Sequence, residues 1–541
     1  MNRTRIGLLL LGIGCLAALA TLNAQESKPP NPPASGATAA VPNVANPTFD
    51  DALRLYRTGK FDAAIQEYQA LENGPQAALA YAQITSVYLR KRDPQNAYAA
   101  AAKAVELAPD APDTKVALGE IYFRQGKIIE ADHEYVAVVN GGGKIARAYL
   151  GLARTSEANS YFHREKQMID RAHALDPTDS EITRFWMRTL TLAERIKALS
   201  DYLAQDTNDD TNARKARALE LAFLQGQLSG PVQQCRMISK ITSTQTELKE
   251  LYDGPNRLFG YGLDVKLNGT SARLLLDTGA SGILVDRRIA EKAGVQHIAQ
   301  TTVQGYGDSG PVAGYVGHAD SIQVGELEFQ DCIVRVDEQN SVVGRDGLIG
   351  ANVFASFLVD LDMPDKKIRL SELPPRPDEP TEAASLDSGS RSDLRYHDRY
   401  IAPEMRDYTP VFRFGHMLLI PTMLNDSVSK LFLIDTGAAM NTVSPDAARE
   451  VTKVSGDSRM TVKGLSGSVK NVYRGDELTL TFAHLRQQNQ DIVAFDTKNQ
   501  SDSVGAELSG GLGFPVLRML DMKIDYRDGL VFFAFDPKRF H

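Results

Sequence analysis

The sequence has little cysteine and no excess of positive charge. Among its 541 residues there are three cysteines, Cys15, Cys235 and Cys332. If the N-terminal segment that holds Cys15 is removed, the chain can form at most one disulfide, which excludes a disulfide-rich scaffold. The pattern leaves open whether Cys235 and Cys332 are joined. The formal net charge of −8 argues against nucleic acid and against an anionic membrane surface as partners.

The sequence also lacks the patterns that bind metals or phosphate groups. Its nine histidines are scattered without ligand spacing, so we expect no metal site. The run GGGK at 141–144 lacks the remaining residues of a phosphate-binding loop and is interpreted as a turn. We therefore expect a protein that works without a cofactor.

Long apolar runs are missing except at the N-terminus. Arg3 and Arg5 precede a mostly apolar stretch from Ile6 to Leu22, and Ala24 ends a plausible cleavage site. This pattern predicts a signal peptide over 1–24, and hence an exported, periplasmic or extracellular protein without a membrane span after its removal. A membrane anchor is the alternative, but the run is short for one. Anchoring as a lipoprotein through Cys15 is less favoured.

Residues 25–47 are rich in Pro, Ala and Asn and predict a flexible linker. A helical pattern follows over 48–250. Within it Gly59, Arg92 and Gly126 each stand five residues before an alanine, and they are spaced by 33 and 34 residues. This region resembles tetratricopeptide repeats, most clearly over 48–180.

The best match to the repeat is the unit with Gly119, Tyr122, Gly126, Ala131 and Tyr135. Arg92 departs from the pattern, as does the fourth unit, and an unrelated helical bundle is the alternative. The resemblance implies an all-α solenoid whose concave face docks a protein partner or substrate.

The residue pattern changes after Gly254-Pro255, where short apolar runs rich in β-branched residues and many glycines begin. We therefore expect two all-β regions, 256–372 and 408–541, joined by a polar linker over 373–407. Each region contains an apolar run that ends in Asp-Thr-Gly-Ala, and the two aspartates, Asp277 and Asp435, are 158 residues apart. An acid at the end of an apolar run is costly unless it has a partner, so we expect the two carboxyl groups to meet.

The repeat extends beyond these motifs. Each β region has a hairpin signal before its aspartate and an apolar step that ends in glycine after it, at Gly350 and Gly513. The second step is imperfect, because Gly511 replaces its first apolar residue. Both β regions resemble retropepsin-like aspartic peptidases, and the resemblance implies two lobes that form a pseudo-dimer.

The resemblance assigns roles to the matching residues. Asp277 and Asp435 are the expected catalytic pair, which shares a proton and activates a water. The active-site loops that support them are Thr278, Gly279, Ala280, Thr436, Gly437 and Ala438. The flap candidates that would pair with a peptide substrate are Gly305, Tyr306, Gly307, Gly464 and Leu465.

The sequence thus predicts an exported aspartic endopeptidase that binds a peptide or protein in a cleft between its lobes. We expect an active monomer in which the lobes pair within one chain. The main rival is a non-catalytic peptide-binding or scaffold protein that keeps the same fold. Substrate, cleavage preference and pH optimum do not follow from the sequence.

Overall fold

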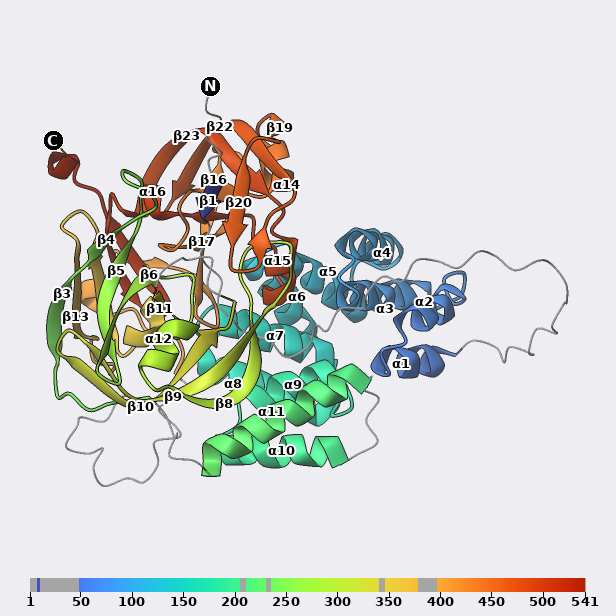
Figure 1. Cartoon of the computed structure of the whole chain (residues 1–541). Helices are drawn as coiled ribbons and strands as arrows, with labels where there is room; N and C mark the ends of the chain where they lie inside the picture. Colours follow the sequence, from blue (N-terminus) through green and yellow to red (C-terminus); the bar gives the residue numbers. More distant parts are fainter. Residues whose placement is uncertain are drawn as a thin grey trace, which may run out of the picture. The chain divides into compact units, whose positions relative to one another are not determined.

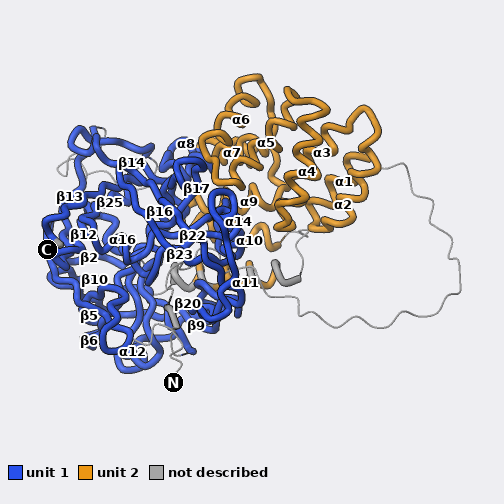
Figure 2. Tube along the Cα trace, turned by 90° about the horizontal axis from the view of Figure 1, so that it is seen from above, with its two compact units in different colours: residues 1–18, 154–166, 226–541 blue, residues 19–153, 167–225 orange. Residues whose placement is uncertain are grey.

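The computed structural model describes residues 7–9, 48–204, 211–229, 235–339, 346–377 and 397–540. The chain divides into two compact units, coloured separately in Figure 2. One unit comprises 19–153 and 167–225, and the other comprises 1–18, 154–166 and 226–541. Most of the predicted signal peptide (1–24) and all of the predicted linker over 25–47 lie outside the described residues, as does the middle of the 373–407 linker. Strand β1 (Gly7–Leu9) pairs in parallel with β20 (Thr461–Gly464).

The first part of the chain is helical from Phe49 onward (Figure 1). Helices α1 and α2, α3 and α4, and α5 and α6 pack on each other in consecutive pairs. The helices are α1 (Phe49–Arg57), α2 (Phe61–Gln69), α3 (Ala77–Arg90), α4 (Pro94–Leu107), α5 (Pro112–Arg124), α6 (Ile128–Asn140), α7 (Ala146–Ala158), α8 (Phe162–Leu175), α9 (Ser180–Arg188), α10 (Leu192–Ala204) and α11 (Thr211–Ser229). The predicted repeat region of helix pairs is confirmed.

The repeat positions have a clear structural reason. Gly59 and Gly126 adopt φ of +73° and +77° in the turns that follow α1 and α5, a conformation that favours glycine. Arg92, at the same place in the second repeat, has φ of +60°. Arg92 thus differs from the repeat pattern in its side chain, but its backbone has a positive φ, as the two glycines do. Gly119 lies against the Tyr135 ring, where a Cβ atom would stand 2.7 Å from it, so the small residue lets two helices approach.

A buried ion cluster joins four of these helices. The Arg147 guanidinium on α7 donates to the Tyr56 hydroxyl on α1 at 2.9 Å and to Glu120 on α5 at 2.7 Å. It also donates to Asp179 and Glu181 at the start of α9, at 3.2 Å each. Breaking such a cluster by removing one partner is costly, so it holds α1, α5, α7 and α9 in one arrangement.

The rest of the chain forms two lobes of β-structure. Lobe 1 is a nine-stranded sheet of β2 (Arg236–Met237), β4 (Lys249–Tyr252), β5 (Leu258–Leu267), β6 (Thr270–Asp277), β7 (Ile283–Asp286), β8 (Gln296–Val303), β9 (Val312–Val324), β10 (Leu327–Asp337) and β11 (Gly347–Gly350), with the helix α12 (Arg287–Lys292) and the 3₁₀ helix η1 (Ala351–Phe354). Lobe 2 is an eight-stranded sheet of β15 (Phe412–Phe414), β16 (Met417–Leu424), β17 (Val428–Ile434), β18 (Thr442–Val443), β19 (Val454–Gly456), β22 (Val472–Phe482), β23 (Leu485–Phe495) and β24 (Gly510–Leu512), with the helices α14 (Pro445–Arg449), α15 (Lys498–Val504) and α16 (Phe514–Leu517).

The two lobes repeat the same hairpin before their aspartates. Asn268 and Gly269 turn β5 into β6 with φ of +47° and +80°, and Asn425 and Asp426 turn β16 into β17 with φ of +46° and +55°. The asparagine side-chain oxygens each accept a backbone N–H, from Ser321 and from Thr479 in the equivalent strands. The duplication therefore extends to individual hydrogen bonds.

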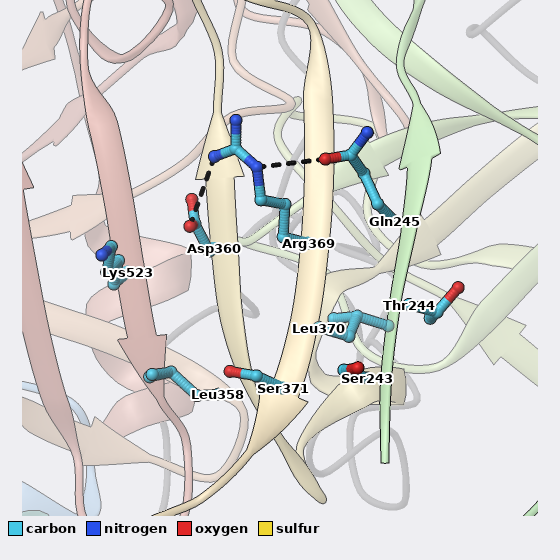
Figure 3. Close-up of a pocket in the computed structure, with 9 residues that line it drawn as sticks. All are labelled: Ser243, Thr244, Gln245, Leu358, Asp360, Arg369, Leu370, Ser371 and Lys523. Atoms are coloured by element: carbon cyan, nitrogen blue, oxygen red, sulfur yellow. Dashed lines mark hydrogen bonds and ion pairs between the residues drawn. The ribbon is translucent and has the colours of Figure 1, made fainter. Parts of the chain in front are cut away.

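A third sheet joins the lobes. Its strands are β14 (Thr409–Pro410), β26 (Leu530–Ala534), β25 (Asp521–Asp525), β12 (Phe357–Asp362), β13 (Lys367–Glu372) and β3 (Ser243–Glu247), in that order. β12 of lobe 1 pairs with β25 of lobe 2, so that Asp360 lies opposite Lys523. Figure 3 shows Arg369 on β13 between Asp360 and Gln245, which it contacts at 3.4 and 3.2 Å.

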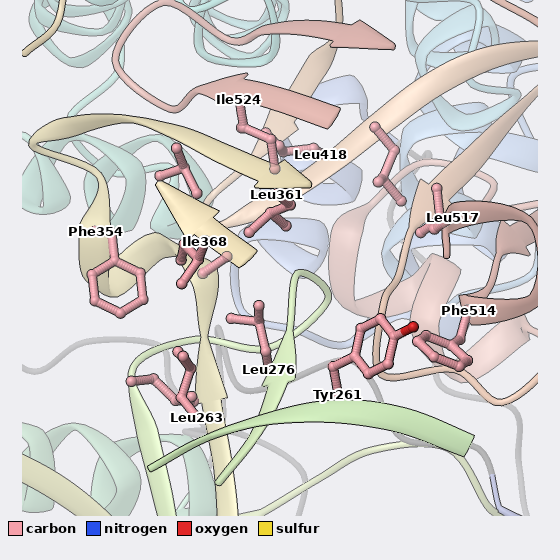
Figure 4. Packing of buried hydrophobic residues seen from close by; sticks show 14 of the residues in the cluster. Tyr261, Leu263, Leu276, Phe354, Leu361, Ile368, Leu418, Phe514, Leu517 and Ile524 are labelled. Atoms are coloured by element: carbon pink, nitrogen blue, oxygen red, sulfur yellow. The ribbon is translucent and has the colours of Figure 1, made fainter. Parts of the chain in front are cut away.

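One hydrophobic core extends through both lobes (Figure 4). The rings of Tyr261 in lobe 1 and Phe514 in lobe 2 meet edge to face at 4.9 Å. Leu361 and Ile368 of lobe 1 and Ile524 of lobe 2 are each at most 1% exposed. The two predicted β regions thus form one packed body, and the predicted pseudo-dimer of two similar β lobes is confirmed.

The β-structure begins earlier than the sequence indicates. We expected helix as far as residue 250 and the first lobe from 256. Instead α11 ends at Ser229, and β2, β3 and β4 precede residue 256. Cys235, next to β2, forms a disulfide with Cys332 on β10. Lobe 1 therefore includes residues from about Cys235 onward.

Candidate active site

The two Asp-Thr-Gly-Ala loops begin where the central strand of each lobe ends. Asp277 is the last residue of β6, and Asp435 directly follows β17. A second strand supports each loop from the side. Gly350 on β11 lies opposite Asp277 in a parallel pair, and the Asp435 N–H donates to the Leu512 carbonyl on β24 at 3.0 Å. Each aspartate therefore lies at the end of a buried apolar strand, which fixes the position of its carboxyl group.

The threonines of the two loops hold each other across the lobe interface. The Thr278 N–H donates to the Thr436 hydroxyl, and the Thr436 N–H donates to the Thr278 hydroxyl, both at 3.0 Å. Each hydroxyl in turn donates to a carbonyl of the opposite lobe, at Ile434 (2.7 Å) and Leu276 (2.9 Å). Both threonine side chains are buried, so these four bonds set the distance between the loops.

The glycines bring the two carboxyl groups together. A Cβ atom on Gly437 would stand 2.4 Å from the Asp277 carboxyl group, and one on Gly279 would stand 2.9 Å from that of Asp435. The Gly279 N–H donates to Asp277 Oδ1 at 2.8 Å, and the Gly437 and Ala438 N–H groups donate to Asp435 Oδ1 at 3.0 Å. The Oδ1 atom of each aspartate is therefore held by backbone N–H groups of its own loop.

The environment of the pair favours a shared proton. Asp277 and Asp435 are at most 1% exposed. Burial raises the pKa of Asp277 to about 7, against the lowering effect of its backbone donors and of a hydrogen bond with Asp435. Burial, and next the charge of Asp277, raise the pKa of Asp435 well above its usual range. Apart from each other, the outer Oδ2 atoms have no hydrogen-bond partner among the described residues.

The imperfect step in lobe 2 keeps the expected geometry. Gly511 lies opposite Leu433 in the parallel pairing of β24 and β17, as an apolar residue would. Gly513 could not be larger, because a Cβ atom there would stand 2.1 Å from the Met440 carbonyl oxygen. The Gly513 N–H donates to the Asn441 side chain at 2.9 Å.

The flap candidates from the two lobes lie against each other. The Ser466 N–H donates to the Tyr306 carbonyl at 2.9 Å, and the Gly305 N–H donates to the Ser466 hydroxyl at 3.1 Å. A Cβ atom on Gly464 would meet the Tyr306 carbonyl, and one on Gly305 would meet Leu465. Gly307, with φ of +127°, passes close to Ser466 in the same way. The two hairpin tips therefore touch directly.

Tyr306 is a buried flap residue whose phenol is influenced by the two aspartates. Its side chain is 2% exposed, and its ring meets that of Phe495 edge to face at 5.5 Å. Burial and the charges of Asp435 and Asp277 raise the pKa of the Tyr306 phenol well above its usual range. The phenol therefore stays protonated at neutral pH, close to the pair.

Sequence reasoning missed several residues that shape the site. In lobe 1, Asn352 accepts the Gly282 N–H at 3.0 Å, and in lobe 2, Asn441 accepts the N–H of Gly513 at 2.9 Å. Ser466 joins the flaps, and His416 Nε2 lies 3.1 Å from the Gly279 carbonyl oxygen. Asn352 follows Gly350 by two residues in the sequence, a signal that was available. His416 and Ser466 carry no such signal, because their partners are distant in the chain.

Other kinds of site find little support in the part of the chain that the structure describes. No group of three or more His, Cys, Asp or Glu side chains there could hold a metal ion. None of its helices is long and apolar enough to cross a membrane. A shallow groove lies on the sheet that joins the lobes (Figure 3), and neither Asp277 nor Asp435 lines it.

Comparison with known proteins agrees with the two-lobe geometry. The aspartyl protease family model matches residues 263–353 and again 420–516. Each match spans one Asp-Thr-Gly-Ala loop and its glycine step. Both lobes are therefore aspartyl protease-like, and the sequence resemblance is confirmed. No curated protein matches the chain.

Three solved structures are similar to parts of the chain. An aspartic proteinase from Irpex lacteus is 14% identical, with a TM-score of 0.34, and covers 55% of this chain and 98% of its own. A retropepsin-like aspartic protease from Rickettsia conorii is 17% identical, with a TM-score of 0.19, and covers 24% of this chain and 92% of its own. A thermophilic TPR protein from Thermus thermophilus is 19% identical, with a TM-score of 0.26, and covers 31% of this chain and 94% of its own.

Proposed function

We propose that this protein is an exported aspartic endopeptidase. The observation that carries the proposal is the buried pair of Asp277 and Asp435, held together by the crossed threonine bonds. Two carboxyl groups so close cannot both ionise easily, so they share one proton. The ionised group takes a proton from the attacking water, while the protonated group donates to the scissile carbonyl oxygen. Aspartic proteases as a class use a carboxyl pair that shares one proton.

The substrate is an extended peptide that lies between the dyad and the flaps. Hairpin tips with free backbone groups pair with such a peptide by strand addition. Here the tips bond to each other through Ser466 and Tyr306. Entry of a peptide therefore requires these contacts between the tips to part.

Two features support export of the protein. The N-terminal pattern over 1–24 has the order of a signal peptide. The disulfide between Cys235 and Cys332 is stable in an oxidising compartment and rare in a reducing one. A periplasmic or extracellular location fits both, and lipoprotein anchoring through Cys15 is the less favoured form of it.

The helical repeats are proposed to dock a protein partner or substrate, as such arrays commonly do. The ion cluster around Arg147 already fills the space where α1, α5, α7 and α9 converge. A partner would therefore bind other faces of these helices. Among them, Leu107 and Ile129, at the end of α4 and the start of α6, are about half exposed.

The decisive experiment is incubation of the mature protein with a diverse peptide mixture from acid to alkaline pH. Wild-type protein should cleave internal peptide bonds, and a transition-state-mimicking aspartic protease inhibitor should stop it. Because burial raises both carboxyl pKa values, the singly protonated pair exists at higher pH than for exposed acids. Activity should fall in acid, where both groups are protonated, and again in alkali, where the shared proton is lost.

The control variants are Asp277→Asn and Asp435→Asn, which keep the shape of the site. Each should lower cleavage to background, because neither remaining carboxyl group can serve as acid and base at once. Cleavage that persists in either variant would contradict the mechanism. Peptide binding without cleavage by the wild-type protein would favour the rival function, a non-catalytic binding protein.

A further inference from the structure

The hairpin that opens lobe 2 carries a buried histidine at its turn. β15 pairs with β16 so that Phe414 lies opposite Met417, which leaves Gly415 and His416 as the two turn residues. The His416 side chain is 4% exposed. Its ring reaches across to lobe 1, where Nε2 lies 3.1 Å from the carbonyl oxygen of Gly279 in the catalytic loop.

The chemistry of this contact determines which ring nitrogen of His416 carries the proton. A carbonyl oxygen only accepts hydrogen bonds, so Nε2 must carry the proton and donate it. Burial lowers the pKa of His416 to about 4, against the raising effect of its hydrogen bond to Gly279, and the nearby charges of Arg335 and Arg413 lower it further. The ring is therefore neutral over the pH range in which the buried dyad titrates, and the contact persists through that range.

The group that His416 holds is part of the active site. The Gly279 carbonyl and the Ala280 N–H belong to one planar peptide unit, so fixing one end fixes the other. The Ala280 nitrogen lies 3.4 Å from the Asp277 backbone oxygen, and its N–H also lowers the pKa of the Asp277 carboxyl group. The N–H of the same Gly279 donates to Asp277 Oδ1 at 2.8 Å, so a contact that holds the Gly279 carbonyl also restrains a donor of the Asp277 carboxyl group.

The equivalent position in lobe 1 holds no donor. Leu274 and Phe432 each stand three residues before the aspartate of their lobe. Leu263 lies opposite Leu274, and Ile420 lies opposite Phe432, so Leu263 and Ile420 are equivalent. Counting back four residues from each makes Phe259 and His416 equivalent as well. The position equivalent to His416 is therefore Phe259, which is 3% exposed. A phenyl ring has no N–H to donate. The two halves of the pseudo-dimer therefore differ at this point.

We propose that His416 is a positioning residue for the dyad, which holds the Gly279–Ala280 peptide unit so that the Ala280 N–H stays directed at Asp277. Because it acts on one lobe only, it makes the two carboxyl groups unequal and favours ionisation of Asp277. The catalytic part of this inference rests on the proposed function; the effect on the carboxyl group does not. Among the described residues, the charge of Asp277 also acts on the phenols of Tyr306 and Tyr526, and it raises the pKa of both.

The test compares His416→Phe with His416→Gln in the full chain. The first variant copies the residue of lobe 1 and removes the donor, and the second keeps a side-chain N–H. Two quantities are measured: the pH dependence of kcat/KM for a peptide, and the carboxyl ¹³C NMR titration of Asp277, assigned by its absence in Asp277→Asn. His416→Phe should raise the pKa of Asp277 by about half a unit to one unit and lower kcat/KM about tenfold or more. His416→Gln should stay close to wild type in both.

The matched control is Phe259→Leu, which disturbs packing at the equivalent place without touching a donor. It should lower Tm without moving the titration of Asp277. An unchanged titration in folded His416→Phe would overturn the proposal, as would a shift of equal size in His416→Gln. If His416→Phe does not fold, His416→Leu removes the same donor with a smaller side chain. A wild-type protein that cleaves nothing would refute the proposed function, while the NMR titration would still decide the role of His416.

Discussion

Gly437 marks the closest approach of the two catalytic loops. An added Cβ atom would stand 2.4 Å from the Asp277 carboxyl group, whereas the nearest atom to a Cβ on Gly511 is the Thr442 hydroxyl oxygen at 3.3 Å. Both glycines lie in lobe 2, and neither has a positive φ. The difference between them is therefore one of space at the dyad.

This contrast gives a prediction at the scale of a residue. Gly437→Ala should push the carboxyl groups apart and lower kcat/KM about 100-fold or more, since displacements of about 1 Å have that effect on positioned groups. Gly511→Ala should stay within several-fold of wild type. Thermal unfolding would show that both variants are folded. Equal activity of the two variants would mean that the spacing of the loops does not limit the reaction.

The predictability of single residues follows from where their partners lie in the chain. Asp277, Thr278 and Gly279 could be predicted because one short motif holds them and a second copy repeats it. His416 could not be found in this way, since its partner Gly279 is 137 residues distant and a lone histidine in an apolar run is usually just a core residue.

At the scale of elements, the missed strands show where sequence patterns fail. β3 has the sequence STQTE, which contains no apolar residue. It is nevertheless an ordered edge strand, because all five of its residues pair with β13, with Ser243 opposite Ser371 and Glu247 opposite Lys367. A pattern of hydrophobic residues cannot reveal a strand whose order comes from backbone pairing with a distant segment.

The disulfide gives the prediction at this scale. The bond between Cys235 and Cys332 closes a loop of 97 residues and ties the start of lobe 1 to β10. Reduction should lower the free energy of unfolding by about 2–4 kcal/mol, measured by denaturant titration with and without dithiothreitol. Cys235→Ser is the control, which should be less stable than wild type and insensitive to the reductant. Equal stability of wild type in both conditions would show that the bond does not constrain this lobe.

At the scale of the whole molecule, both described ends of the linker between the lobes meet at one residue. Arg376, before the gap, forms a buried ion pair with Asp528. After the gap, the Tyr400 N–H donates to Asp528 Oδ1 at 2.8 Å, and Arg399 donates to the Asp528 carbonyl at 2.7 Å. The predicted flexible linker over 373–407 is therefore fixed at its ends.

This closure favours pairing of the lobes within one chain. The sheet that joins them pairs β12 with β25 over five residues, and the core in Figure 4 contains side chains of both lobes. A tether that keeps two lobes together gives an effective concentration on the order of millimolar. We therefore expect an active monomer, whose specific activity does not fall when the protein is diluted.

Mixing two inactive variants separates this arrangement from its alternatives. In the monomer, Asp277→Asn and Asp435→Asn are each inactive. Their mixture is also inactive, because every chain has an amide in place of one of its two catalytic carboxyl groups. If like lobes paired between chains, each variant would keep one intact site and cleave alone. If lobe 1 of one chain paired with lobe 2 of another, the mixture would regain one good site in each mixed dimer. We expect no recovery at any ratio, even after joint unfolding and refolding, since the tethered lobes of one chain find each other first.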